Sequence, residues 1–226
     1  MDRPDPTVRR LIPEVVELAA RCPFPAPGTP VTCAVSGGAD SLALLALAVG
    51  AGCVATAIHV DHGLRPGSAT EARVVAAAAD RVGADFRAVT VAVAPGPNLE
   101  ARARQARYRA LPGDVLTGHT ADDRAETVLL HLLRGAGVAG LAALAPGPRR
   151  PLAGLRRADT EWVCASLGFD VVHDPSNLDP VHRRNRVRHE LLPLATDIAG
   201  RDLVPVLTRQ ADLVRAVDVH DEHRGG

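Results

Sequence analysis

VTCAVSGGADSLALLALAV, residues 31–49, is the stretch of sequence that decides the fold. Its first five residues are a short apolar run, which is typical of a buried parallel strand. SGGADS at 36–41 follows directly, and the apolar residues from Leu42 to Val49 predict a helix. A strand, a glycine-containing turn and a helix in this order form the repeating unit of an α/β fold.

The same alternation continues along the chain. Apolar residues at helical spacing up to Leu18 predict a helix before the first strand. Further strands are predicted at 53–60, 86–93 and 114–117, and further helices at 70–81, 98–111 and 121–133. Beyond Gly135 the chain is rich in Gly, Pro and Arg, with helices predicted at 158–167 and from Leu203 onward. We expect a Rossmann-like parallel sheet with helices on both faces, plus a small, mostly helical C-terminal extension.

The composition narrows the class of protein. The 226 residues contain 46% apolar and 23% charged side chains, as in a globular domain, and 26 basic residues balance 26 acidic ones. All the basic residues are Arg, so the sequence offers no lysine for a Schiff base or a P-loop. Zero net charge argues against a uniformly basic nucleic-acid coat, although it permits a local basic patch.

The cysteines and the N-terminus favour a reducing, cytoplasmic compartment. No two cysteines form a CxxC pair, and the first residues contain no apolar segment of a signal peptide. Residues 42–60 carry no Asp, Glu, Lys or Arg, yet Gly50-Ala51-Gly52 interrupts them. A helix, a turn and a buried strand are therefore favoured over a membrane span.

The loop at 36–41 has the features of a phosphate site. Gly37 and Gly38 allow the backbone to approach a phosphate, and N–H groups at a helix start attract anions. The hydroxyls of Ser36 and Ser41 can add donors. Asp40 would repel a phosphate unless it holds Mg²⁺ or a substrate cation. An ordinary turn with a capping residue is the alternative, which this strand and helix context disfavours.

SGGADS resembles the PP-loop of the N-type ATP pyrophosphatases. Three further blocks narrow the resemblance, namely HVDHGLR at 59–65, GHTADDRAETVLLHLLRGAGVAGL at 118–141 and DPSNLDPVHRRNRVRHELLP at 174–193. Together with NLEARARQARY at 98–108, they resemble the tRNA(Ile)-lysidine synthetase family over about residues 30–195. The resemblance implies an enzyme that adenylates a wobble cytidine of isoleucine tRNA with ATP and Mg²⁺, and then joins free lysine to it.

The resemblance also implies roles for individual residues. ATP would lie against Ser36, Gly37, Gly38, Ala39, Asp40, Ser41, His59, Asp61 and Arg107, with Asp40 as the Mg²⁺-side carboxylate. Catalysis would involve Asp40, His119, Asp123 and Glu126. The substrates would contact Asp123, Glu126, Arg104, Arg134, Arg184, Arg186 and Arg188.

The acidic group after the fourth predicted strand has two interpretations. Carboxylates in a first helical turn favour the helix dipole, and this capping role explains Asp122 well. Asp123 and Glu126 share a helix face, and two carboxylates suit a cationic ligand such as free lysine. We expect a base for the ε-amine of lysine here, with Asp123 ahead of His119. A zinc site is disfavoured because a single His lies nearby.

The basic residues also have competing interpretations. Arg104 and Arg107 can neutralise nucleotide phosphate, dock RNA or simply face solvent. Arg134 and Gly135 fit an ordinary helix C-cap. The cluster from Arg183 to His189 can follow an RNA backbone, or its arginines can pair with Asp174 and Asp179.

Alternative functions stay open from sequence alone. A tRNA thiolase or an amide-forming ATP pyrophosphatase is one, and a non-catalytic ATP-binding protein is another. The predicted domains are 1–28, an N-terminal helix and linker; 29–145, a nucleotide-binding catalytic domain; and 146–226, a helical, arginine-rich extension. The short C-terminal part fits a short form, a fragment, or a homodimer that shares its RNA-binding surface.

Overall fold

The computed structural model describes residues 11–61, 68–91, 102, 105–106, 109–141 and 145–222. The chain forms two compact units, each assembled from separate stretches. Unit 1 comprises Met1–Gly118, Gly147–Leu152 and Ala158–His173, and unit 2 comprises His119–Pro146, Ala153–Arg157 and Asp174–Gly226. The linear domain limits expected from the sequence stay a prediction, because these units are defined by internal contacts and not by independent folding.

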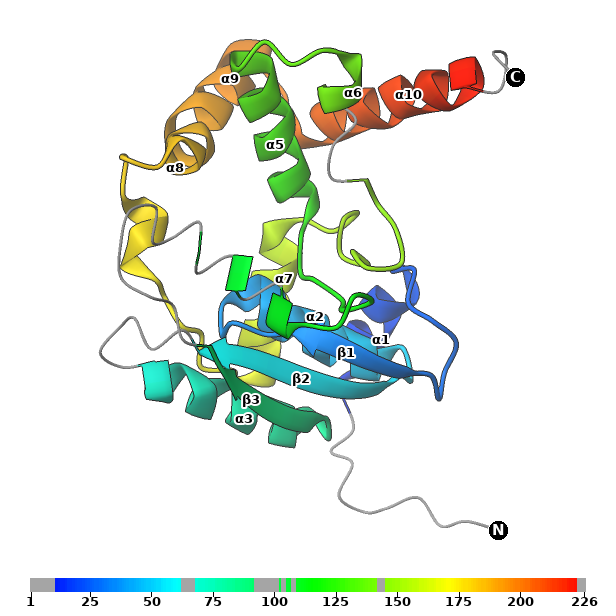
Figure 1. Ribbon diagram of the computed structural model, residues 1–226, viewed down its shortest axis with the longest axis vertical. Helices are drawn as coiled ribbons and strands as arrows, with labels where there is room; N and C mark the ends of the chain where they lie inside the picture. The colour runs from blue at the N-terminus through cyan, green and yellow to red at the C-terminus, as the bar shows by residue number, and fades with distance from the viewer. Residues whose placement is uncertain are drawn as a thin grey trace. The chain divides into compact units, whose positions relative to one another are not determined.

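A parallel sheet forms the centre of unit 1 (Figure 1). Its strands are β1 (Pro30–Ala34), β2 (Val54–Asp61) and β3 (Asp85–Thr90), in that spatial order. The register pairs Cys33 with Ala57 and His59 with Ala88. These strands confirm the three parallel strands predicted at 31–35, 53–60 and 86–93.

The fourth predicted strand, at 114–117, is wrong as an extended element. The described residues there form a single parallel bridge between Leu116 and Cys33. Leu116 N–H donates to the Thr32 carbonyl at 2.8 Å, and Ala34 N–H donates to the Leu116 carbonyl at 2.9 Å. The apolar residues here are only Val115 and Leu116, and Pro112 and Gly113 lie just before them, separated by Asp114. Pro and Gly both weaken strands, so the extended stretch is short.

The bridge nevertheless fixes the geometry of the future site. It places Leu116 beside β1, on the side opposite β2. The strands β2 and β3 therefore lie on one side of β1, and the segment with Leu116 lies on the other. Such a change of side is the switch point where open α/β sheets bind ligands.

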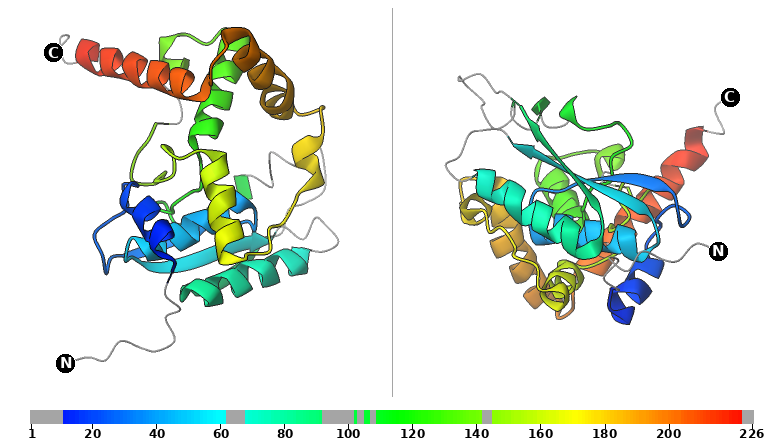
Figure 2. Two further views of the ribbon diagram at one scale, coloured as in Figure 1. Left: turned by 180° about the vertical axis from the view of Figure 1, so that it is seen from behind. Right: turned by 90° about the horizontal axis from the view of Figure 1, so that it is seen from below.

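Two helices cover one face of the sheet. α2 (Ala39–Gly50) and α3 (Ser68–Val82) both pack against β2, and Figure 2 shows them on the same side of the sheet. α1 (Pro13–Ala20) packs on α2. Residues Leu42–Ala48 of α2 are all buried, which explains why this stretch lacks charge. Among the described residues, no helix is long and apolar enough to cross a membrane.

The opposite face of the sheet is also covered. Ile58 and Val60 alternate along β2 and therefore point to the same face of the sheet. There they pack with Leu111 and Val115, which lie in the segment that leads to Leu116. The helix predicted at 98–111 lies largely outside the described residues, but 102, 105–106 and 109–110 are helical. α7 (Arg157–Leu167) matches the helix predicted at 158–167, and all of it except Arg157 belongs to unit 1.

Unit 2 is helical, as predicted for the C-terminal extension. Its elements are α5 (Ala121–Leu133), α6 (Val138–Leu141), the 3₁₀ turn η1 (Pro175–Leu178), α8 (Arg183–Arg186), the π turn η2 (Val187–Leu191), α9 (Leu192–Ala199) and α10 (Val204–Glu222). Ala121 and Ala125 of α5 pack against Val204, with Leu192 and Leu207 around them. The small residues allow α5 and α10 to approach closely.

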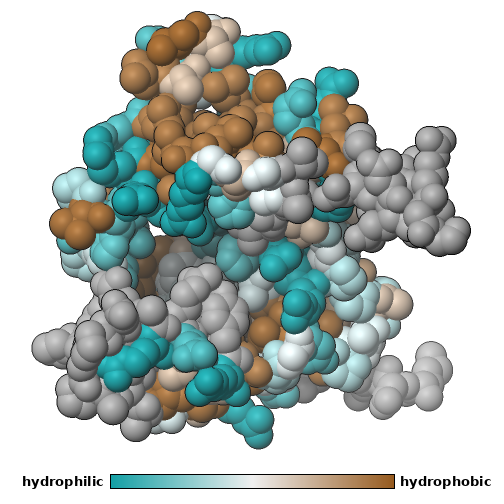
Figure 3. Space-filling model, turned by 45° about the horizontal axis from the view of Figure 1, so that its top comes forward, coloured by the Kyte–Doolittle hydropathy of each residue, from teal (hydrophilic) through white to brown (hydrophobic). Residues whose placement is uncertain are grey.

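The helical run from α8 to α9 is anchored near its start. Asn185 donates from its side-chain amide to the carbonyls of Ser176 and Asp179, at 2.6 and 2.8 Å. The π turn η2 precedes Pro193, which has no N–H to donate to a residue four positions back. Farther along, exposed apolar side chains include Leu194 and Ile198, and Figure 3 shows apolar residues gathered on this unit.

We predict that Gly118→Ala destabilises the protein by roughly 2 kcal/mol, within the usual range for overpacking. A Cβ at position 118 would lie 2.5 Å from the Asp40 carbonyl oxygen, which is a backbone atom next to the glycine loop and cannot move aside as a flexible side chain could. Urea unfolding measures the effect. Gly113→Ala is the matched control, because nothing lies within 4 Å of its Cβ. Equal stability of the two variants would show that the loop does not depend on this close approach.

Candidate active site

The loop between β1 and α2 needs a glycine at position 37. Gly37 has a φ of +94°, a conformation that side chains other than hydrogen strain. Its carbonyl accepts a 3.0 Å hydrogen bond from Val172 N–H, and a Cβ would come within 2.8 Å of the Val172 Cγ2 atom. The neighbouring Gly38 is the N-cap of α2. The loop thus presents bare backbone beside a helix start, as an anion site requires.

The two serines hold the loop in shape. Ser41 donates its hydroxyl to the Gly38 carbonyl at 2.8 Å and accepts from Ser36 N–H at 3.1 Å. The two hydroxyls lie 3.2 Å apart. Ser36 is exposed, so its hydroxyl can be reached from solvent. These contacts give Ser41 a structural role in addition to the predicted ligand role.

Asp40 lies in the first turn of α2 and is held by a residue that the sequence did not single out. Thr160 of α7, which is fully buried, donates its hydroxyl to Asp40 Oδ1 at 2.5 Å. A neutral hydroxyl orients a carboxylate without cancelling its charge. Mg²⁺ is commonly bound by one or two carboxylates plus substrate phosphates, so the chemistry of Asp40 fits the predicted Mg²⁺-side role.

His59 is buried below the loop, with 2% of its surface exposed. Its Nδ1 lies 2.9 Å from the carbonyl oxygen of Val35, the residue before the loop. Its Nε2 is buried without a hydrogen-bond partner among the described residues. Asp61, at the end of β2, is half-buried and its carbonyl accepts from Val91 N–H at 2.8 Å. Arg104 and Arg107, which were predicted to contact the substrates and ATP, lie outside the described residues.

Asp123 closes the capping box of α5, while Asp122 lies in the first turn, as the helix-dipole role predicted for it requires. Thr120 is the N-cap, and Asp123 occupies the third helical position, where a capping box closes. Asp123 Oδ2 accepts from Thr120 N–H at 2.8 Å and from the Thr120 hydroxyl at 3.1 Å. The spacing from the N-cap decides the matter, because only the third residue reaches back to it.

Asp122 instead holds two consecutive arginines. Its two oxygens accept from Arg156 Nε and an Arg156 terminal nitrogen, both at 3.1 Å. Oδ2 also accepts from the backbone N–H of Arg157 at 2.8 Å. Burial opposes ionisation, but these hydrogen bonds and charges outweigh it and lower the pKa of Asp122 below its usual value. Asp122 thereby holds Arg156 and Arg157, which both belong to unit 2.

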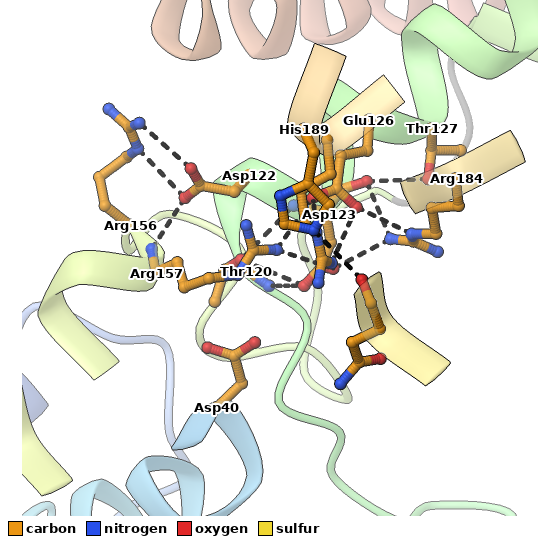
Figure 4. A network of polar contacts seen from close by, with 12 residues as sticks. Asp40, Thr120, Asp122, Asp123, Glu126, Thr127, Arg156, Arg157, Arg184 and His189 are labelled. Atoms are coloured by element: carbon orange, nitrogen blue, oxygen red, sulfur yellow. Dashed lines mark hydrogen bonds and ion pairs between the residues drawn. The ribbon is translucent and has the colours of Figure 1, made fainter. Parts of the chain in front are cut away.

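Glu126 is fully buried and is bound by three guanidinium groups (Figure 4). Its Oε1 accepts from Arg157 at 3.0 Å and from Arg188 Nε at 2.7 Å. Its Oε2 accepts from Arg184 Nε at 2.8 Å and from the second nitrogen of Arg188 at 3.1 Å. A carboxylate has about four acceptor positions, and all four are used. In this arrangement Glu126 has no acceptor left for the ammonium of lysine.

The remaining oxygen of the acidic pair faces the same arginines. Asp123 Oδ1 accepts from Arg184 at 2.9 Å and lies 3.5 Å from nitrogens of Arg157 and Arg188. Two carboxylates therefore meet three guanidinium groups, which leaves a local charge of +1. Burial alone would raise the pKa of Glu126, but the hydrogen bond and charge of Arg188, with Arg157 and Arg184, hold it below its usual value.

Three predicted residues lie outside this cluster. His119 is half-buried, immediately before the N-cap of α5. Arg134 is exposed and is the C-cap of that helix, which fits the ordinary capping interpretation. Arg186 is exposed and pairs with Glu190 one turn away, at 2.8 Å. Arg184 and Arg188 contact Glu126, and Arg184 also contacts Asp123. Of the acidic partners considered for them, Asp174 caps η1 and Asp179 accepts from Val181 N–H.

Sequence reasoning missed Arg156, Arg157 and Thr160. They belong to RRADT at 156–160, at the start of a helix that the sequence did predict. Two adjacent arginines before a helix are a usable signal, because the three acidic residues at 122, 123 and 126 outnumber the one arginine among them, Arg124. Nothing local in the sequence points from Thr160 to Asp40.

The comparisons with known proteins show the family of the chain. A family model described as a PP-loop domain matches residues 14–195. A tRNA(Ile)-lysidine synthase of Nocardia farcinica is 46% identical over 207 residues, covering 88% of this chain and 64% of that protein. One of Rhodococcus erythropolis is 47% identical over 194 residues, covering 82% and 60%. The chain thus spans somewhat under two thirds of the length of these curated relatives.

One solved structure supports the fold. A U34-tRNA thiolase, NcsA, from Methanococcus maripaludis, determined with its [4Fe-4S] cluster, matches with a TM-score of 0.67. The match covers 89% of this chain and 79% of that one at 16% sequence identity. At this identity the likeness concerns the fold alone.

We predict that Glu126→Gln lowers the free energy of unfolding by about 3 kcal/mol at pH 7, because three half-buried guanidinium groups lose the buried carboxylate that they share. Urea denaturation gives the value. Glu190→Gln makes the same chemical change in an exposed pair on α8 and η2, and it should leave stability unchanged. Similar losses in both variants would contradict the central role given to the Glu126 cluster.

The pH dependence should follow from the lowered pKa values of Asp122 and Glu126. A carboxylate with a lowered pKa in the folded state stabilises the protein above its unfolded-state pKa, and this stability is lost as the pH falls through the folded-state pKa. The stability difference between wild type and Glu126→Gln should therefore persist down to the ordinary Glu value of 4.5 and shrink below it. Urea midpoints measured in a pH series test this; a difference that stays constant in acid would contradict it.

Proposed function

Because the chain belongs to the PP-loop domain family, we propose that it joins lysine to the wobble cytidine of an isoleucine tRNA at the expense of ATP. The 46% identity to the Nocardia farcinica tRNA(Ile)-lysidine synthase over 88% of the chain carries this proposal. Each unit adds chemical support, since unit 1 carries a phosphate-type loop and unit 2 carries a cluster of carboxylates and arginines. We place the reaction in a reducing, cytoplasmic setting, in keeping with four free cysteines.

The first step would use the loop of unit 1. The C2 oxygen of the cytidine attacks the α-phosphate of ATP, pyrophosphate leaves, and the cytidine becomes adenylated. Backbone N–H groups of residues 38–40 and the hydroxyl of Ser36 would hold the departing pyrophosphate. Mg²⁺, when bound, would offset the negative charge that builds on the phosphates. Asp40 would hold the metal, and Thr160 would keep the Asp40 carboxylate in one orientation.

The second step would use the carboxylates of unit 2. The ε-amine of lysine displaces AMP from C2, so one C–N bond forms and one C–O bond breaks. Asp123 is our candidate for the group that accepts the amine proton, with His119 as the second candidate. Glu126 has a different role from the one expected, because its four hydrogen bonds make it the residue that orients Arg157, Arg184 and Arg188.

The tRNA would meet the basic side of the helical run in unit 2. α8 has the sequence RRNR, and both Arg183 and Arg186 are exposed. Phosphate contacts of this kind position an RNA without reading its sequence. A homodimer that shares this RNA surface stays part of the proposal.

The thiols of this chain argue against sulfur transfer as the second candidate function. Burial raises the pKa of Cys33 and Cys164 to about 12 and that of Cys22 to about 11. Cys53 is buried and its pKa is raised as well. Sulfur chemistry needs a thiolate, which such surroundings disfavour.

The test is incorporation of radiolabelled lysine into an isoleucine tRNA transcript with a wobble cytidine, with AMP release followed in parallel. We expect label that requires ATP and that cytidine. Asp40→Asn should lower incorporation at least about 100-fold, as expected when a preorganised charge is removed from a reacting phosphate. AMP release without label would move the acceptor elsewhere, and absence of both products would contradict the proposal.

Asp123→Asn tests the base separately from the helix cap. An amide oxygen at this position can still accept from Thr120 N–H, so the capping box survives while the proton acceptor is lost. We expect ATP-dependent adenylation of the cytidine, followed as pyrophosphate release, to continue and lysine transfer to fall by about 100-fold or more, as for loss of a general base. Wild-type lysine transfer in this variant would exclude Asp123 as the base.

A further inference from the structure

The carboxylates proposed to meet lysine are already satisfied by arginine. Glu126 uses its four acceptor positions on Arg157, Arg184 and Arg188, and Asp123 Oδ1 accepts from Arg184. Adding the ammonium of lysine to this arrangement would raise the local charge from +1 to +2. It would find no acceptor on Glu126 and at most one on Asp123 Oδ1, which already faces nitrogens of Arg157 and Arg188 at 3.5 Å. A buried cation with too few acceptors, next to other cations, is disfavoured. The cluster therefore favours lysine only when one guanidinium group leaves.

Arg184 is the guanidinium group best placed to leave. Its side chain is 36% exposed, against 23% for Arg157 and for Arg188. Arg188 forms a two-point contact with Glu126, and Arg157 is fixed through its backbone N–H to Asp122. Arg184 contacts the cluster through Nε to Glu126 and one terminal nitrogen to Asp123. Its departure would free one acceptor on each carboxylate, which is what a bridging ammonium needs.

A phosphate group is the natural alternative partner for Arg184. Arg184 lies on α8 between the exposed Arg183 and Arg186, so this short helix offers a dense positive charge to an anion. Guanidinium groups bind phosphate oxygens in the same two-point geometry as they bind carboxylates. Moving Arg184 to a phosphate and lysine into the vacated position keeps the cluster at two carboxylates and three cations, so the exchange preserves the local charge of +1.

We propose that Arg184 is an exchangeable counter-ion that couples lysine binding to phosphate binding: it blocks the carboxylates of Asp123 and Glu126 until a phosphate group draws it away. This inference rests on the proposed function, because it takes lysine as the ligand of that cluster. The phosphate can come from the tRNA backbone or from ATP. The coupling would keep lysine out of the site until the substrate that it must modify or the nucleotide that activates it is bound.

Equilibrium dialysis of radiolabelled lysine against the full chain tests the coupling. Lysine is titrated alone, with the isoleucine tRNA transcript, and with a non-hydrolysable ATP analogue. We expect lysine to bind about 10-fold more tightly with the phosphate source that draws Arg184 away, a typical strength for coupled sites. The two arms distinguish tRNA from ATP. By reciprocity, lysine should tighten that ligand by the same factor.

Arg184→Gln separates the exchange from a general loss of charge. This variant should bind lysine about 10-fold more tightly than wild type in the absence of any phosphate ligand, and added tRNA or analogue should change its lysine affinity little. Arg201→Gln removes the same charge from an exposed position between α9 and α10 and should keep the wild-type coupling. Circular dichroism and urea unfolding verify that both variants fold.

The outcomes separate this inference from the proposed function. Lysine affinity that is the same with and without both phosphate ligands, in a protein that attaches lysine to tRNA, would overturn the exchange and leave the proposed function standing. Weaker lysine binding by Arg184→Gln in the absence of phosphate would also overturn it, since Arg184 would then assist lysine. Failure to attach lysine to tRNA under any condition would overturn both.

Discussion

The burial of one carboxylate, that of Glu126, is the constraint on which unit 2 depends. A carboxylate removed from water carries a large desolvation penalty unless cations and donors replace its hydration. Here the replacement comes from three arginines on two other segments, at positions 157, 184 and 188. These segments are 31 to 62 residues away along the chain. The cluster therefore acts as a polar core that joins α5, the first residue of α7, and the run from α8 to η2.

The two units handle negative charge in opposite ways. The loop of unit 1 offers backbone groups and hydroxyls, and its carboxylate Asp40 is held by the neutral Thr160 hydroxyl. These groups are of the kinds that receive a phosphate and its metal. In the Glu126 cluster of unit 2 both carboxylates already face guanidinium groups, so a cationic ligand is favoured when it replaces a residue and not when it simply adds to the cluster. This difference explains why a nucleotide could bind first and a cationic amino acid could be admitted conditionally.

Local rules predicted much of the fold because they depend on near neighbours in the sequence. Apolar runs bounded by glycine located β1 and β2, and helical periodicity located α5 and α7 to within a residue or two. The strand at 114–117 failed because two apolar residues between Pro112-Gly113 and Gly118 suffice for one bridge and no more. Asp123 as the capping residue was within reach of the sequence, since the N-cap at Thr120 fixes which residue closes the box.

The contacts between distant segments could not be predicted from one sequence. Nothing near Glu126 announces that it meets arginines at 157, 184 and 188, and nothing near Asp40 announces Thr160. The local pattern of Asp123 and Glu126 predicted a cationic ligand, but it could not say that arginines of the same chain contact both carboxylates. Pairing partners are set by tertiary structure, which a periodicity does not contain.

The exclusive use of arginine has a physical consequence at such a site, whatever the origin of the composition. A lysine in place of Arg184 or Arg188 would put a primary amine, the same chemical group as the proposed substrate, next to the carboxylates that would receive it. Such an amine could lose a proton and attack an activated intermediate. A guanidinium group stays protonated and presents a planar fork that satisfies two carboxylate oxygens at once, as Arg188 does with Glu126. Arginine can therefore stand in for the substrate cation electrostatically without competing with it chemically.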